Sequence, residues 1–237
     1  MKIFASGSCR LVASVNDGHG KVRPIHSMFH NFTGINFLGK LHNTKQHIQF
    51  LRFLKDEITL PDDILRKFLT SYGGFHGRFT DCEDRSLLPL KKEAIKHQFD
   101  DCEWYLFEIC SMKRYQYNGF EVQHEVTKEY SCSVQTEAEL MEDLHTIRAL
   151  VPAQKKILFQ VHFRPDVIYG DPRQAIVQRD TIYRTVHAFC QQTEHTFLHD
   201  PSVLLRANRA LFDGDTHFSP RGLRENFAYL YSHYLNH

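Results

Sequence analysis

The sequence lacks the features that mark membrane, zinc-binding and nucleic-acid-binding proteins. No apolar run approaches the roughly 20 residues of a membrane-spanning helix. The six cysteines form no C-x-x-C pair and have no regular spacing, which argues against a structural zinc site and against a disulfide framework. The 29 basic residues are dispersed among 28 acidic ones and the formal net charge is +1, so we expect no dominant surface for nucleic acid or an anionic membrane.

Further absences bear on the expected compartment and cofactors. Only a few apolar residues precede Ser6, too few for the core of a signal peptide, so we expect a cytoplasmic protein with free thiols. The sixteen histidines are scattered, and none forms the i, i+4 pair with an intervening acid that binds zinc on a helix. We therefore expect no bound metal and no cofactor.

What the sequence contains is an alternation of apolar strands and amphipathic helices. Continuous apolar runs predict strands buried on both faces, and apolar residues three and four apart predict helices. Strands are expected at 2–5, 23–29, 104–110, 156–163 and 196–199, helices at 11–15, 43–58, 62–69, 136–151, 175–192 and 219–234, a hairpin excursion at 114–132, and N-caps at Asn43 or Thr44, Thr136 and Ser219. This order favours a parallel sheet with helices on both faces.

The length and composition fit one hydrophobic core. With 237 residues and 42% hydrophobic content, the chain is long enough for a sizeable core without a second domain. No linker divides the sequence. We therefore expect a single domain over residues 1–237, with a helical and loop insertion around 16–100.

The first strand runs into a turn of small residues at positions 6–10. Gly7 lets the backbone turn sharply, and a hydroxyl and a thiol follow it. This is the arrangement with which an α/β fold exposes a nucleophile at the carboxyl edge of its sheet. Cys9 is the first candidate nucleophile, and Ser8 is the second if the turn is shifted by one residue. A tight turn with Cys9 packed beneath it is the structural alternative.

The central strand expected at 104–110 carries one charge, Glu108. A carboxylate is costly to bury without a partner. We therefore expect Glu108 either to find a partner or to lie at the carboxyl end of the strand, near Ser111 and Lys113. His162 stands at the end of the next strand and is a candidate for lining a pocket or for packing.

The end of the chain places a histidine beside carboxylates. Asp213 and Asp215 precede His217, and Ser219 with Pro220 predicts the N-cap and first turn of the last helix. We expect His217 on a short loop before that helix. An acid that hydrogen-bonds one ring nitrogen would fix the tautomer and suit the other nitrogen to general-base catalysis. The alternative is a histidine that merely contacts the start of the helix.

These two blocks resemble those of the SGNH (GDSL-like) hydrolase superfamily. Gly7 aligns with the glycine of the family's Gly-Asp-Ser turn, which places Ser8 at the Asp and Cys9 at the nucleophilic Ser. The Gly-Ser-Cys form is similar to the GSCFA-type branch and to related bacterial polysaccharide-locus proteins. The resemblance implies a three-layer α/β/α sandwich with a central parallel sheet of the flavodoxin-like type.

The resemblance also implies partners for the nucleophile. The family's last block has an Asp three residues before its His, where this chain has Gly214, so Asp213, Asp215 or neither orients His217. The family's oxyanion hole uses an Asn after the central strand. Here no Asn stands there, and Ser111 is the nearest side-chain donor. The remaining candidates for oxyanion or substrate binding are Gly7, Gly39 (or Gly34), Arg10 and His162.

The implied function is acyl transfer by an esterase, thioesterase or O-acyltransferase, acting on a small or sugar-linked acyl group. The expected partners are a small-molecule or glycan acyl substrate, with an acyl thioester as a candidate donor, and no nucleic acid. Two alternatives stay open. One is a catalytically weakened member of the fold that binds a glycan or nucleotide-like ligand, and the other is a metal-assisted hydrolase with Asp213, Asp215, His217 and His162 as ligands.

Overall fold

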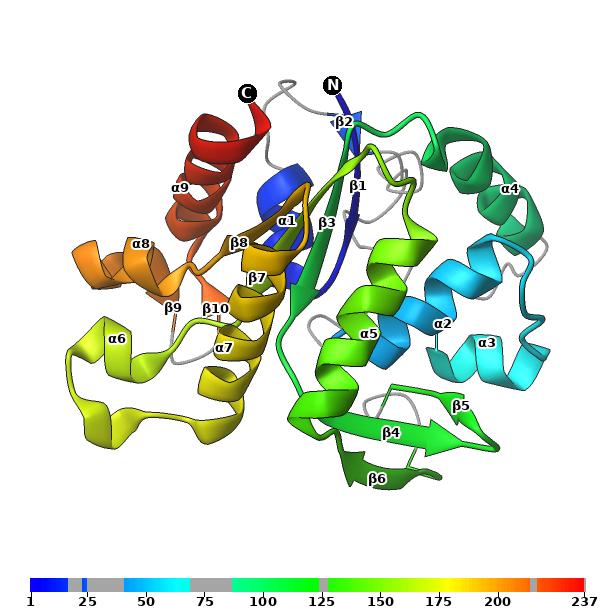
Figure 1. The fold of residues 1–237 in the computed structure, drawn as a ribbon, viewed down its shortest axis with the longest axis horizontal. Coiled ribbons are helices and arrows are strands. Elements are labelled where there is room, and N and C mark those ends of the chain that lie inside the picture. Colours follow the sequence, from blue (N-terminus) through cyan, green and yellow to red (C-terminus); the bar gives the residue numbers. More distant parts are fainter. Residues whose placement is uncertain (17–22, 25–40, 69–86, 124–127, 214–216, 237) are drawn as a thin grey trace.

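The computed structural model describes residues 1–16, 23–24, 41–68, 87–123, 128–213 and 217–236 (Figure 1). Among these residues, five parallel strands form one sheet in the order β2-β1-β3-β7-β8. The strands are β1 (Lys2–Ser6), β2 (Arg23–Pro24), β3 (Trp104–Ile109), β7 (Lys156–Val161) and β8 (Thr196–His199). Counted along the sheet, this is the 2-1-3-4-5 order of flavodoxin-like folds.

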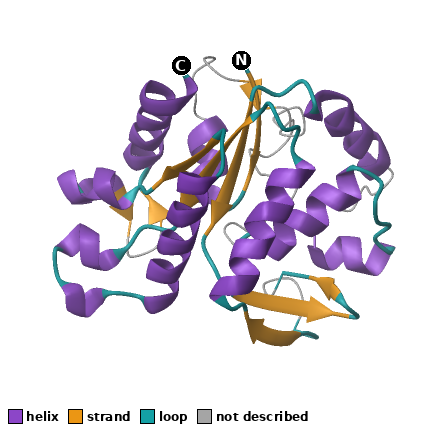
Figure 2. Ribbon diagram, in the orientation of Figure 1, coloured by secondary structure: helices purple, strands orange, loops and turns teal. Residues whose placement is uncertain are grey.

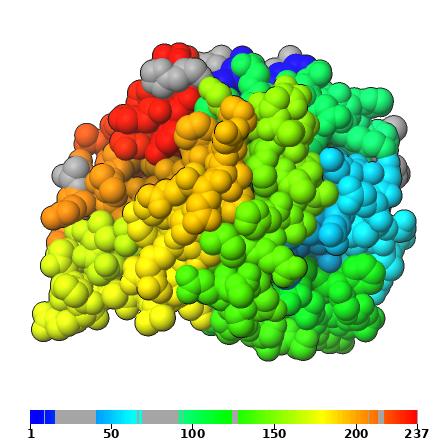
Figure 3. All heavy atoms as spheres, in the orientation of Figure 1, coloured from blue at the N-terminus to red at the C-terminus, as the bar shows by residue number. Residues whose placement is uncertain are grey.

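Helices cover both faces of the sheet, so the fold is a three-layer α/β/α sandwich, as predicted (Figures 1 and 2). One face packs against α1 (Cys9–Asn16) and α9 (Pro220–Leu230), which continues into a π-helical turn, η5 (Tyr231–Leu235). The opposite face packs against α2 (Thr44–Leu54), α5 (Glu137–Leu150) and α7 (Val177–Gln192), of which α5 and α7 lie side by side at the surface (Figure 3). No helix in the described part of the chain is both long and apolar enough to cross a membrane.

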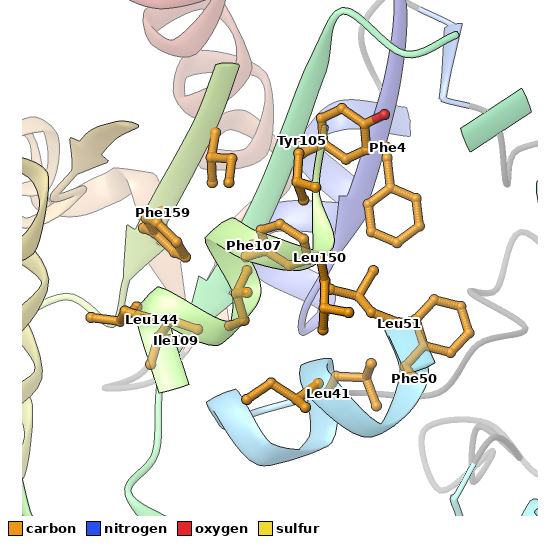
Figure 4. Packing of buried hydrophobic residues seen from close by; sticks show 14 of the residues in the cluster. Phe4, Leu41, Phe50, Leu51, Tyr105, Phe107, Ile109, Leu144, Leu150 and Phe159 are labelled. Atoms are coloured by element: carbon orange, nitrogen blue, oxygen red, sulfur yellow. The ribbon is translucent and has the colours of Figure 1, made fainter. Parts of the chain in front are cut away.

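The larger core lies between the sheet and α2, α5 and α7. Alternation along the strands puts Phe4, Phe107 and Phe159 on this face (Figure 4). The ring centroids of Phe4 and Phe107 are 5.8 Å apart, and those of Phe107 and Phe159 are 6.0 Å apart. Ile3 and Leu106 belong to the second core beneath α1 and α9. Both faces of these strands are thus buried, which explains why the strands are apolar throughout.

The helix expected at 43–58 is shorter than predicted. Asn43 caps α2 by accepting a hydrogen bond from the backbone N–H of Gln46, but the helix ends at Leu54. Asp56 then takes a left-handed backbone conformation with φ of 61°, which interrupts the helix before Ile58. Thr136 is the N-cap of α5, as predicted, and forms a capping box with Glu139. Of the strand expected at 23–29, only Arg23–Pro24 lies within the described residues.

The expected hairpin excursion is present as a three-stranded antiparallel sheet, in the order β5-β4-β6. Its strands are β4 (Lys113–Tyr117), β5 (Phe120–Glu121) and β6 (Ser131–Val134). The described residues include α3 (Asp62–Phe68), which was expected, and α4 (Leu87–Phe99), α6 (Pro165–Tyr169), η3 (Pro172–Gln174), α8 (Ser202–Ala207) and η4 (Arg209–Leu211), which were not. Four of these five unexpected elements are six residues or shorter, too short to show a period. The single domain over 1–237 with an insertion around 16–100 stays a prediction.

His47 joins α2 to the end of β1. Its Nε2 lies 2.9 Å from the backbone oxygen of Glu108, and because a carbonyl only accepts, Nε2 carries the proton. Nδ1 is then the acceptor for the Ser6 hydroxyl, 3.0 Å away. Burial lowers the pKa of His47 to about 4, although the hydrogen bond to Glu108 opposes this shift. The ring is therefore neutral near pH 7. Its two hydrogen bonds connect α2 with β1 and β3 near the carboxyl ends of these strands.

We predict that stability falls as the pH drops below about 6.5, because His47 stays neutral in the folded protein but protonates in the unfolded chain. The unfolded chain binds more protons between pH 6.5 and about 4, so the contribution is complete above that window and is lost within it. For His47 alone the loss at pH 5 is about 2 kcal/mol. Urea unfolding at pH 7.5 and 5.0 measures it.

Two variants isolate this effect. His47→Gln should reduce the stability difference between the two pH values by about 2 kcal/mol, whereas the same change at the exposed His97 should leave the difference as it is. An undiminished pH dependence in His47→Gln would contradict the assignment.

Candidate active site

The candidate site lies at the carboxyl edge of the sheet, where β1 and β3 end side by side. β2 lies on one side of β1 and β3 on the other, so the strand order reverses at this point. Such a topological switch point is where open α/β sheets bind their ligands. The two strands therefore bring residues 7–10 and 108–111 together at the place where this fold class has its sites.

Gly7 is required by the close approach of the first turn to β3. A Cβ atom at this position would lie 2.5 Å from the Cβ atom of Glu108, closer than any real side chain tolerates. The absence of a side chain at Gly7 lets the turn pass directly over Glu108. Gly7 thus has a packing role, beside the turning role that the sequence predicts.

The first turn is built around the carboxylate of Glu108. Oε2 of Glu108 accepts hydrogen bonds from the backbone N–H of Ser8 at 2.8 Å and from its hydroxyl at 2.5 Å. Oε1 accepts from Nε of Arg10 at 2.6 Å. The prediction that Glu108 finds a partner is confirmed, and its partners come from the turn after β1. Neither Ser111 nor Lys113 is among them.

These contacts hold Glu108 in its charged form inside the protein. The side chain is fully buried, and burial alone would raise its pKa. The charge of Arg10 and the hydrogen bonds from Ser8 and Arg10 outweigh burial, so the pKa of Glu108 lies below its ordinary value. Ser8 is 2% exposed and Arg10 6%. Arg10 is therefore a buried partner of Glu108, where the sequence suggested a residue that faces an anionic substrate.

Cys9 is the first residue of α1. Its backbone lies at the helix N-terminus, where the aligned peptide dipoles favour negative charge. Ser8 precedes the helix, and its carbonyl accepts the backbone N–H of Val12 at 3.1 Å, so the turn and the first turn of α1 form one unit. The structure describes the backbone of Cys9 but not its side chain.

The C-terminal block forms a small antiparallel pair of strands. β9 (Phe212–Asp213) and β10 (His217–Phe218) pair so that His217 stands opposite Asp213. His217 is therefore the first residue of a short strand and not a loop residue as expected, and it is half-buried. The side chain of Asp213 and the whole of Asp215 lie outside the described part of the chain.

The start of α9 is fixed directly after this pair of strands. Ser219 is the N-cap, as predicted, and its hydroxyl accepts the backbone N–H of Gly222 at 3.1 Å. A Cβ atom at Gly222 would overlap the backbone oxygen of Leu211, so only glycine lets the helix start pack this closely against the end of η4. Sequence reasoning missed Gly222, because a glycine inside a helix carries no sign of which backbone passes over it.

The segment after β3 differs from the expected oxyanion loop. The backbone N–H groups of Cys110 and Ser111 both donate to the backbone oxygen of His42, at 2.9 and 3.0 Å. The hydroxyl of Ser111 accepts the backbone N–H of Lys113 at 3.0 Å and retains its own proton for donation. Gly39, the other candidate donor, lies outside the described residues.

His162 follows β7 at the same edge and is buried. Its Nδ1 lies 3.2 Å from the backbone oxygen of Phe163, so Nδ1 carries the proton. Burial and then the charges of Arg10 and Arg179 lower the pKa of His162 to about 2. His162 is therefore a neutral side chain close to the turn, and it is not suited to be a general base near pH 7. Among the described residues, no group of three His, Cys, Asp or Glu side chains could hold a metal ion.

Comparison with solved structures identifies the fold class. The chain is similar to a member of the lipolytic protein G-D-S-L family from Veillonella parvula DSM 2008, with a TM-score of 0.51 and complete coverage of both chains. At 8% sequence identity this likeness shows the fold alone, and it confirms the fold that the SGNH resemblance implies. No curated protein matches the chain in sequence.

A sequence match to a domain family identifies the family of this chain. Residues 1–132 match the TviD N-terminal domain, and the chain belongs to that family. The matched segment includes the turn with Ser8 and Cys9 and the strand with Glu108, and it ends before His217. Assignment to the GSCFA-type branch stays a prediction.

We predict that Glu108 and Arg10 stabilise the fold as a pair. Glu108→Gln leaves a buried guanidinium without its counter-charge, and Arg10→Met leaves a buried carboxylate, so each change should lower the free energy of unfolding by about 3–5 kcal/mol. The double variant should lose less than the sum, because no charge is left alone. Urea unfolding of the four proteins gives the coupling energy.

The surface pair Arg52 and Glu57, 3.9 Å apart, is the matched control. Its members are half exposed, so the corresponding single and double changes should alter stability little. Additive losses at Glu108 and Arg10 would rule out the buried pair as the anchor of the turn.

Proposed function

We propose that this protein is an acyl-transfer enzyme, an esterase, thioesterase or O-acyltransferase, in which Cys9 is the nucleophile and His217 the general base. The observation that carries the proposal is the place of Cys9, at the start of a helix at the switch point of a GDSL-type sheet. That position combines the carboxyl end of a strand with a helix dipole that favours a thiolate.

The structure of the turn supports Cys9 over Ser8. The hydroxyl of Ser8 donates its single proton to Glu108 and the side chain is buried. A serine in this state faces the sheet, and the carboxylate that accepts its proton is a weak base, because Arg10 and the hydrogen bonds lower the pKa of Glu108. Ser8 instead anchors the turn, as a structural residue, and the next residue is the one that α1 presents at its N-terminus.

The C-terminal block supports His217 as the base. The register of β9 and β10 places it opposite Asp213, and directly opposite residues of an antiparallel pair are close enough to interact. This favours Asp213 over Asp215 as the residue that orients the imidazole. The acid then stabilises the imidazolium that forms when the thiol loses its proton.

The proposed reaction has two halves. His217 takes the proton of the Cys9 thiol, and the thiolate sulfur bonds to the carbonyl carbon of the acyl donor. The carbonyl π electrons move to oxygen, where the backbone N–H of Cys9 donates to the oxyanion. The intermediate then expels the alkoxide or thiolate leaving group, which takes the proton from His217. Water or an acceptor hydroxyl releases the acyl group from Cys9 by the same steps in reverse.

One observation favours a second function, ligand binding without turnover. The amides of Cys110 and Ser111 both donate to the carbonyl of His42, so neither is available to an oxyanion. A weakened member of the fold would bind a glycan or nucleotide-like ligand at the same edge. The two functions differ in whether Cys9 becomes acylated.

We predict that the protein hydrolyses p-nitrophenyl acetate and that Cys9→Ala and His217→Ala each lower kcat/KM by about 10²–10⁴-fold. Intact-mass analysis should find one acetyl group on Cys9, accumulating in His217→Ala. The exposed thiol Cys132 is the matched control, and Cys132→Ala should keep full activity.

The alternative assignments predict different results. If Cys9→Ala retains acetylation and turnover, Cys9 is not the nucleophile. Activity lost with a chelator but not with iodoacetamide would favour the metal-assisted hydrolase. Stable binding of sugars without any acetylated protein would favour the binding function.

A further inference from the structure

A row of polar side chains crosses the sheet beneath α1 and α9. The register pairs Glu108 on β3 with Gln160 on β7, and Gln160 with His199 on β8. All three are buried, and residues in register in a parallel sheet point to the same face. Polar groups buried in this way need hydrogen-bond partners from the helices above them. For Glu108 these partners come from the turn before α1 and from its first residues.

Asn226 on α9 supplies the partners for the other two. Its Oδ1 lies 2.8 Å from Nε2 of His199, and its Nδ2 donates to Oε1 of Gln160 and to the hydroxyl oxygen of Ser14, each at 3.1 Å. Ser14 belongs to α1. One fully buried carboxamide therefore links α9 with α1, β7 and β8.

The direction of these hydrogen bonds is fixed by the neighbours. Ser14 donates its only proton to the backbone oxygen of Arg10 at 2.6 Å, so its oxygen must accept from Asn226. Since Nδ2 of Asn226 therefore faces Ser14, Oδ1 faces His199 and accepts from its Nε2. Burial lowers the pKa of His199 to about 4, so the ring is neutral near pH 7. Both polar atoms of the Asn226 side chain are thus used, and the other orientation of the amide would set Oδ1 against the Ser14 oxygen.

The contact between Ser14 and Asn226 lies at a similar distance from the start of each helix. Ser14 follows Cys9 by five residues, about 7.5 Å along α1, and Asn226 follows Pro220 by six, about 9 Å along α9. The helices lie side by side and both run away from the carboxyl edge of the sheet (Figure 1). Because Ser14 and Asn226 meet, the two helix starts are nearly level, and His217 stands three residues before one of them.

We propose that Asn226 is a positioning residue that sets the spacing between His217 and Cys9. The inference rests on the proposed function. Ser219 at the start of α9 and Tyr234 in the following η5 also make hydrogen bonds to the rest of the fold. Between these two ends Asn226 supplies the polar contacts to the sheet and to α1, and the remaining contacts are apolar and do not fix a helix along its axis. In the described part of the structure Gln160 Nε2 has no hydrogen-bond partner, so loss of Asn226 would also remove the bond that Gln160 Oε1 accepts from it. Displacement of a base by about 1 Å is enough to cost on the order of 10²-fold in rate.

The test measures the thiol of Cys9 directly. The rate of alkylation of Cys9 by iodoacetamide, followed by peptide mass mapping as a function of pH, reports the pKa of the thiol, which a nearby His217 lowers. Asn226→Leu, similar in volume, should raise the midpoint by about one pH unit or more and lower kcat on p-nitrophenyl acetate by on the order of 10²-fold, with KM little changed. Asn226→Asp keeps the acceptor for His199 and should fall between wild type and Asn226→Leu.

The matched control is a buried carboxamide on the other face of the sheet. Gln135 Nε2 donates to Asp143 and Thr44, at 2.7 and 3.2 Å, and the residue lies next to α5. Gln135→Leu should also lower stability, but it should leave the alkylation midpoint of Cys9 where it is. Should Asn226→Leu fail to fold, Ser14→Ala tests the same link, because it removes the contact between the two helices and otherwise only a hydrogen bond within α1, to the backbone oxygen of Arg10.

The outcomes separate this inference from the function on which it rests. If the wild-type thiol shows no lowered midpoint and no turnover, the proposed function fails. If the wild type shows both, and Asn226→Leu and Ser14→Ala keep the midpoint and kcat of the wild type, the positioning role alone is overturned. A midpoint that rises equally in Gln135→Leu also overturns it, because the effect would then follow from lower stability.

Discussion

The carboxylate of Glu108, buried at the carboxyl end of β3, is the charge around which this edge of the sheet is built. Removing a carboxylate from water costs several kcal/mol unless the protein replaces its hydration. Here the replacement comes from one short segment, through Ser8 and Arg10. The turn after β1 can make these contacts only by passing directly over the acid, and this is why Gly7 has no room for a side chain.

The two faces of the sheet differ in the kinds of side chain that they bury. The face toward α2, α5 and α7 is an aromatic and aliphatic core, which contributes most of the buried apolar surface. The face toward α1 and α9 combines a smaller apolar core with the polar row of Glu108, Gln160 and His199. Apolar contacts hold layers together without fixing their register, whereas satisfied hydrogen bonds have direction. The helix that begins at Cys9 and the helix that follows His217 thus make directional contacts with the sheet, as His47 of α2 does on the opposite face.

This arrangement anchors the segments on which the proposed site is built. The turn before Cys9 is anchored by an ion pair, and the strand that carries His217 leads directly into a capped helix start. The departure from the SGNH pattern is at the oxyanion loop, where amides after β3 pair with His42. A thiolate nucleophile makes less demand on a base than a hydroxyl does, which is consistent with a site that differs from the Gly-Asp-Ser pattern at several positions at once.

Apolar periodicity and cap residues act locally, so the strands of the main sheet, the capped helices and the parallel α/β class could be predicted from the sequence. The sequence also showed that Glu108 needs a partner, since a lone charge in an apolar strand is costly. The folded structure was needed to show that the partners are Ser8 and Arg10, about a hundred residues away, and that Gly222 packs against the backbone of Leu211. It was also needed to show that the N-H groups of Cys110 and Ser111 are already paired. These contacts depend on which distant segments of the chain pack together, and the local pattern of side chains does not specify that.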